Sequence, residues 1–228
     1  MRVQSSEVRF QISEFRVQIG LRIAVCLALW IACAGLVRAD EVIDRVLAVV
    51  GGEMITLTDV TAARDLGLVI APPAGDPVRA ILSRLIDREL ILAEVERYAP
   101  PEPPAEAIDA QVQTVRARFP GGDAFQQALR RSGIDEKHLR ETLREDLRIR
   151  AYLDQRFAVP APSEDELLAY YREHPEAFTR GTNRLSFDAV RPQIVETLVA
   201  SQRKTLVDDW VAGLRRRGDI TDLYLATQ

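Results

Sequence analysis

Prolines and glycines divide the chain beyond residue 76 into pieces of helical length, and this punctuation constrains the fold more than any other feature of the sequence. A proline interrupts a helix beyond its first turn, and a glycine commonly ends one. Such breaks stand at residues 100–104, 120–122, 133, 160–162, 175 and 218. Between them, apolar residues recur three and four positions apart, which is the period of an amphipathic helix. The sequence therefore predicts a mostly helical protein.

The expected helices cover residues 59–66, 77–98, 108–119, 123–132, 136–157, 164–174 and 187–217. Side chains that accept hydrogen bonds from the first backbone amides of a helix are expected at four of the starts, namely Thr58, Asp76, Asp135 and Ser163. Pro192 lies close enough to the start of the last helix to be tolerated, or that helix begins a residue or two later. That helix, the longest, is expected to bury one face, formed by Val190, Ile194, Leu198, Leu206, Trp210 and Leu214.

Short β segments are expected at the two ends of this helical region. Residues 42–50 are rich in β-branched side chains, and Gly51-Gly52 separates them from a second candidate strand at 53–57, which together indicate a β-hairpin. Residues 220–225 indicate a last short strand. An isolated hairpin is only marginally stable, so we expect this last strand to pair with 46–50. The expected fold class is mostly α with a small antiparallel β-sheet.

The amino terminus is typical of an export signal. Residues 23–37 form an uncharged apolar run of 15 residues, preceded by several arginines. A spanning helix needs about 20 apolar residues, so a secretory signal peptide covering 1–39, cleaved after Ala39, is the favoured interpretation. An uncleaved anchor is the alternative. A lipoprotein attached through Cys33 is less favoured, because Trp30 stands where a small aliphatic residue is expected.

Removal of residues 1–39 changes the chemistry of the chain. Both cysteines, Cys26 and Cys33, lie in this segment, so the mature chain needs no disulfide and tolerates an oxidising compartment. The segment also holds five Arg and two Glu, so the formal net charge changes from −4 to −7. Such an acidic protein is a poor candidate for binding nucleic acid.

The residues that carry chemistry are sparse. His138 and His174 are the only histidines and stand 36 residues apart, which fits no zinc or haem spacing. The sequence has neither a glycine-rich phosphate loop nor a nucleophile-elbow pattern. We therefore expect no catalytic residue, no cofactor and no metal site.

Several segments, in order, nevertheless resemble the N-terminal domain of the SurA-type periplasmic chaperones. They read VIDRVLAVVGGEMITLTDV, LIDRELILAEVER, RFPGGDAFQQALRRSGIDEKHLRETLREDLRIRAYLDQRF and PSEDELLAYYREHPEAF, and the most specific pieces are AVVGGEMITLTD and LIDRELIL. The tail, FDAVRPQIVETLVASQRKTLVDDWVAGLRRRGDI, resembles the helix and strand that complete the same core. The resemblance implies a SurA-like (trigger-factor-like) helical chaperone core, formed by residues 40–178 and completed by residues 187–228.

The chain departs from that family at one place. In the family, one or two parvulin-type prolyl isomerase domains precede the final helix, and each needs roughly a hundred residues. Here only eight residues, 179–186, separate Phe178 from Phe187. The resemblance therefore implies a chaperone core in which a short loop replaces the isomerase domains.

The function that the resemblance implies is an ATP-independent holdase of the periplasm. Its partners would be unfolded outer-membrane β-barrel precursors and the outer-membrane assembly machinery, with membrane contact only through an uncleaved signal. Phe119, Phe125 and Tyr152 are candidate client-binding residues, the alternative being that they belong to the core. Two rival functions are a prolyl isomerase, by family alone, and a non-catalytic adaptor subunit of an envelope complex.

Overall fold

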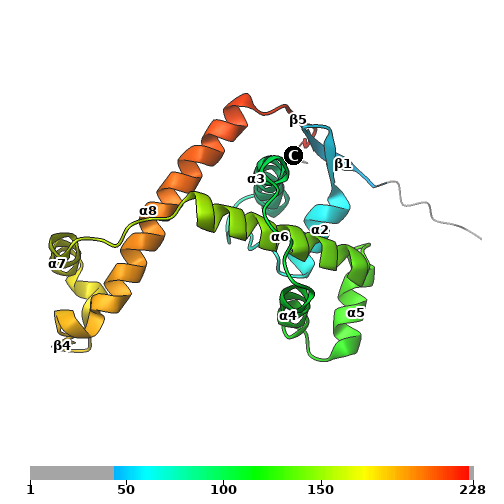
Figure 1. Ribbon diagram of the computed structural model, residues 1–228. Coiled ribbons are helices and arrows are strands. Elements are labelled where there is room, and N and C mark those ends of the chain that lie inside the picture. The colour runs from blue at the N-terminus through cyan, green and yellow to red at the C-terminus, as the bar shows by residue number, and fades with distance from the viewer. Residues whose placement is uncertain (1–43, 226–228) are drawn as a thin grey trace, which may run out of the picture. The chain divides into compact units, whose positions relative to one another are not determined.

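The computed structural model describes residues 44–225, so the predicted signal peptide and its cleavage at Ala39 lie outside the described residues. The expected fold class is confirmed, because helices dominate and the strands form small antiparallel sheets (Figure 1). The elements in order are β1 (Val46–Val50), β2 (Glu53–Thr56), α2 (Leu57–Asp65), α3 (Pro77–Tyr98), α4 (Ala105–Arg116), α5 (Gly122–Arg131), α6 (Glu136–Arg156), α7 (Glu164–Glu173), the 3₁₀ helix η1 (Pro175–Phe178), β3 (Thr179–Arg180), β4 (Asn183–Arg184), α8 (Phe187–Arg217) and β5 (Ile220–Asp222).

The main sheet joins the two ends of the described chain. Its strand order is β2-β1-β5, both pairings are antiparallel, and Val50 stands opposite Ile220. The backbone N–H of Gly51 also donates to the carbonyl oxygen of Asp219 at 2.9 Å. The predicted pairing of the first and last strands is thus confirmed. The central strand buries Leu47 and Ala48 completely, so its backbone groups need hydrogen-bond partners on both edges.

The cap of α2 differs from the prediction, which placed it at Thr58. The helix begins at Leu57, and Thr56 is its cap. The hydroxyl of Thr56 accepts from the N–H of Asp59 at 3.3 Å, and the Asp59 carboxylate accepts from the N–H of Thr56 at 2.8 Å. This reciprocal pair satisfies two amides at once. The N–H of Thr58 donates instead to the carboxylate of Asp44.

Two hydrophobic clusters occupy the part of the molecule around α3. The first packs the sheet and α2 against α3, together with the C-terminal ends of α6 and α8. The second lies between α4, α5 and the start of α6. There α4 ends at Arg116, three residues before the predicted end at Phe119. Just beyond its end, the Arg118 guanidinium donates to the carbonyl oxygens of Leu66 and Gly67, at 3.0 and 2.6 Å, and so holds this turn against the end of α2.

A third cluster joins α7 and η1 to the start of α8, and its buried members include Leu167, Phe178 and Ile194. Residues 179–186, expected to be a loop, contain the β3–β4 hairpin, with Gly181 at φ +62° in its turn. The hairpin is held locally, since the Tyr171 hydroxyl donates to the Leu185 carbonyl at 2.5 Å. A short, pinned hairpin therefore connects η1 to α8.

The long helix α8 runs from α7 to the main sheet (Figure 1) and buries a different face at each end. Val190 and Ile194 are buried in the third cluster, whereas Leu214 is buried in the first. Leu206, predicted to face inward, is 43% exposed, so that prediction is wrong. Steps of four residues advance about 40° around a helix of 3.6 residues per turn, so Leu206 lies about 160° from Val190.

Candidate functional site

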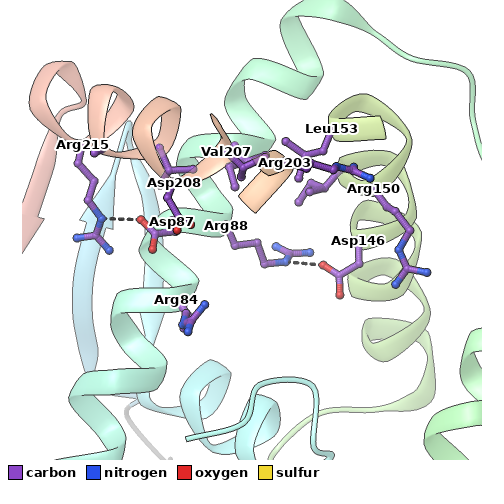
Figure 2. Close-up of a pocket in the computed structure, with 14 residues that line it drawn as sticks. Arg84, Asp87, Arg88, Asp146, Arg150, Leu153, Arg203, Val207, Asp208 and Arg215 are labelled. Atoms are coloured by element: carbon purple, nitrogen blue, oxygen red, sulfur yellow. Dashed lines mark hydrogen bonds and ion pairs between the residues drawn. The ribbon is translucent and has the colours of Figure 1, made fainter. Parts of the chain in front are cut away.

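An open groove lies between α3, α6 and α8 (Figure 2), with a cavity volume of about 620 Å³. Apolar side chains from all three helices line it, and charged side chains stand among them. The apolar lining residues are Ile91, Ile149, Leu153, Val207, Val211 and Ala212. A groove that combines apolar and charged lining suits a polypeptide segment better than it suits a compact polar metabolite.

Helix packing creates the groove. The helix α3 packs against both α6 and α8. Near their ends, α6 and α8 meet through aromatic rings, with the centroids of Tyr152 and Trp210 6.0 Å apart and those of Phe157 and Trp210 5.3 Å apart. Beside α3, side chains of both helices such as Ile149 and Val207 are only partly buried and line the groove.

An ion-pair network fixes one wall of the groove. The Arg88 guanidinium contacts the carboxylates of Asp146 and Glu145 at 2.8 Å each, and that of Glu89 at 2.9 Å. Burial alone would lower the pKa of Arg88, but Asp146 and Glu145 outweigh it and raise that pKa. Burial likewise raises the pKa of Glu89, against the attraction of Arg88. A cation with three carboxylate partners holds α3 and α6 in a defined relation.

A second set of polar contacts fixes α8 to α3 at the other wall. The Arg215 guanidinium contacts the Asp87 carboxylate at 2.5 Å and donates to the Ser83 carbonyl oxygen at 2.7 Å. In Figure 2 this pair and the Arg88–Asp146 pair stand on opposite sides of the groove. The groove is thus held open by polar contacts on both sides.

The groove continues along α8 as a shallower hollow of about 440 Å³. Val199, Ala200 and Val207 supply its apolar surface, and Val207 lines both hollows. Together the two hollows follow α8 from Glu196 to Arg215, a span of about 30 Å at 1.5 Å per residue. An extended polypeptide of about nine residues has that length.

Of the three predicted client-binding residues, Phe119 and Phe125 lie together and Tyr152 lies in a different cluster, and none of them lines this groove. Phe125 is fully buried in the second cluster, and its ring centroid lies 5.8 Å from that of the partly buried Phe119. Tyr152 is 5% exposed and packs against Tyr98 and Trp210. In this conformation Phe125 and Tyr152 serve the core, because their rings face neighbouring side chains and not solvent.

The sequence contains a signal for the groove that the prediction did not use. Val199, Val207 and Val211 widen the apolar face of α8. At about 100° per residue, Val199 lies between Leu206 and Trp210 around the helix, while Val207 and Val211 lie about 20° and 60° beyond Leu214. A helix with apolar residues on more than one face needs more than one partner surface. The apolar surface of α8 is therefore too wide for one packing partner, and this width was the sequence signal for the groove.

Neither histidine is assembled with further metal-binding side chains. Within residues 44–225, no group of three or more His, Cys, Asp or Glu side chains is arranged to hold a metal ion. The His174 ring stacks on Tyr170, with centroids 4.1 Å apart, and its Nδ1 lies 3.0 Å from the Tyr170 carbonyl oxygen. Within the same range, none of the helices combines the length and the apolar character needed to cross a bilayer.

The comparisons with known proteins bear on the fold alone. No family model matches it, and no curated protein does. A solved chain is similar over 79% of this chain and 100% of its own length, with 13% sequence identity and a TM-score of 0.49. That chain comes from a structural study of two proteins of the human pathogen Campylobacter jejuni, the virulence factor PEB4 and the periplasmic protein Cj1289. They are described as structurally related SurA-like chaperones.

Proposed function

We propose that the protein is an ATP-independent holdase that binds unfolded polypeptide along α8. The observation that carries the proposal is the groove between α3, α6 and α8, together with its continuation over Val199 and Val207. Exposed apolar surface of this length can shield an unfolded segment from aggregation. Its shallow, open form favours weak binding, which allows release without a nucleotide.

The finer parts of the proposal come from the resemblance of the sequence segments. We propose that the protein acts in the periplasm after removal of residues 1–39, and that its clients are outer-membrane β-barrel precursors. In this proposal residues 40–178 and 187–228 form one chaperone core, and 179–186 stand where isomerase domains occur in the resembled family. The outer-membrane assembly machinery would receive the released clients.

Light scattering of a diluted, unfolded outer-membrane porin tests the holdase proposal. The wild-type protein is expected to delay aggregation at a few-fold molar excess. The variant Val199→Glu/Val207→Glu is expected to lose most of this effect, because charges in the hollow oppose apolar contact. The matched control, Gln202→Glu/Thr205→Glu, adds the same charge to exposed positions of α8 outside the lining of both hollows.

Undiminished aggregation with the wild-type protein would overturn the holdase proposal and favour the adaptor alternative. Equal protection by the two double variants would contradict client binding in the groove. A protease-coupled assay on a proline peptide distinguishes the isomerase alternative. The barrier to prolyl isomerisation is about 18–20 kcal/mol, and we expect no lowering of it. A rate above background would contradict a purely non-catalytic chaperone.

A further inference from the structure

We infer that the groove selects client segments in which acidic residues stand beside apolar ones, and that Arg84 and Arg150 make this selection. The inference rests on the proposed function and adds the chemistry of the preferred client. Arg84 belongs to α3 and Arg150 to α6, and both line the groove.

The charges of the groove lining do not balance. It contains five arginines and three aspartates, a formal excess of two positive charges. This sign is opposite to that of the whole chain, whose formal net charge is −4. An acidic segment is therefore attracted to this groove although most of the surface repels it.

The excess charge resides on two particular side chains. Arg88, Arg203 and Arg215 each contact a carboxylate of the protein, namely Asp146, Asp154 and Asp87. The remaining aspartate of the lining, Asp208, contacts Lys204. Within residues 44–225, Arg84 and Arg150 form no ion pair, and both are exposed. In Figure 2 the Arg88–Asp146 pair lies between them.

A second hollow carries the opposite charge to that of the groove. It lies on the side of α3 and α6 nearer to the hairpin and α2. Its charged lining is mainly acidic, with two arginines against six carboxylates: Glu53, Asp59, Glu89, Glu141, Glu145 and Asp146. Arg84 also lines that hollow and so stands at the boundary between the two. An acidic client segment would be repelled there and attracted to the arginine-lined groove.

The ligand class follows from the chemistry of the lining. A guanidinium donates two parallel hydrogen bonds to a carboxylate. The apolar floor, including Ile91, Ile149 and Val207, accepts aliphatic or aromatic side chains of the same segment. Residues of an extended chain are about 3.3 Å apart, so a segment with its apolar side chains on this floor can place an Asp or Glu a few positions away beside Arg84 or Arg150. The preferred client segment thus combines apolar residues with Asp or Glu a few positions away.

Fluorescence anisotropy with three labelled peptides tests the inference on the full-length protein. The peptides share one apolar pattern and differ only in the flanking residues, which are Asp, Asn or Lys. We expect the Asp peptide to bind about fivefold more tightly than the Asn peptide, as two exposed ion pairs allow, and the Lys peptide to bind most weakly. The difference should shrink in high salt.

The variant Arg84→Gln/Arg150→Gln should bind the Asp and Asn peptides equally. The control Arg130→Gln/Arg131→Gln removes the same charge from exposed positions on α5 and should keep the wild-type preference. Equal binding of the Asp and Asn peptides to the wild-type protein would overturn the charge selection and leave the holdase groove intact. No binding of any peptide would overturn both. Stronger binding of anionic lipid vesicles than of the Asp peptide would also contradict a polypeptide occupant.

Discussion

At the scale of single residues, two glycines near the end of α8 offer a matched test of packing. A Cβ at Gly218 would lie 2.7 Å from Leu90 Cδ2 and 3.0 Å from the Leu214 carbonyl oxygen. We expect Gly218→Ala to lower the free energy of unfolding by about 1–3 kcal/mol. At Gly213 the Cβ would meet only the tips of arginine side chains, at 3.5 and 3.6 Å.

Gly213→Ala is therefore expected to raise the free energy of unfolding by up to about 1 kcal/mol, the propensity difference between alanine and glycine within a helix. Urea denaturation of both variants measures the two effects. Equal effects of the two substitutions would contradict the packing described for the end of α8.

Asp76 couples the start of α3 to the carboxyl end of the described chain. Its carboxylate accepts from the N–H of Arg79 and from the hydroxyl of Tyr224, and these bonds lower the pKa of Asp76 below 3.8. A lowered pKa contributes stability that is present above pH 3.8 and is lost as the pH falls through the folded-state pKa.

Asp76→Asn retains a capping side chain but removes this titration. The melting temperature of the wild type is expected to exceed that of the variant at neutral pH, with the difference shrinking as the pH falls below 3.8. Parallel melting curves across the acid range would contradict a role for the Asp76 carboxylate. Thermal melts at a series of pH values provide the measurement.

At the scale of elements, the sequence predicted most of the residues at which helices begin and end. Caps at Asp76, Asp135 and Ser163 were predicted correctly, since each presents an oxygen to the first amides of its helix. The cap of α2 was misplaced, although Thr56 and Asp59 have the spacing of a reciprocal cap. The predicted buried face of α8 is confirmed at Val190, Ile194 and Leu214 and is wrong at Leu206, because the two ends of the helix pack on different partners.

The strand β5 completes the main sheet, and deleting it tests how much this third strand stabilises the protein. It pairs with β1 along three residues, and Leu223 N–H also donates to the Leu47 carbonyl oxygen at 2.9 Å. A chain ending before residue 218 is expected to melt at a clearly lower temperature, because β1 would keep only its hairpin partner. An unchanged melting temperature would show that β5 contributes nothing to the sheet.

At the scale of the whole molecule, the sequence predicted which segments pack side by side better than it predicted which surfaces remain uncovered. The closure of the sheet by residues 220–225 followed from the instability of an isolated hairpin. The groove did not follow, because it depends on how three helices cross. Phe125 and Tyr152, predicted to bind clients, are buried, whereas the groove is lined by aliphatic and charged side chains.

Site-specific photocrosslinking tests the central claim, that unfolded polypeptide lies along α8, most directly. A photoreactive amino acid replaces Val207, which lines both hollows, or Gln202, which lines neither and serves as the control. We predict strong crosslinks from position 207 to an unfolded outer-membrane porin, and only background from position 202. Equal crosslinking from the two positions, or crosslinks from position 202 alone, would contradict the account.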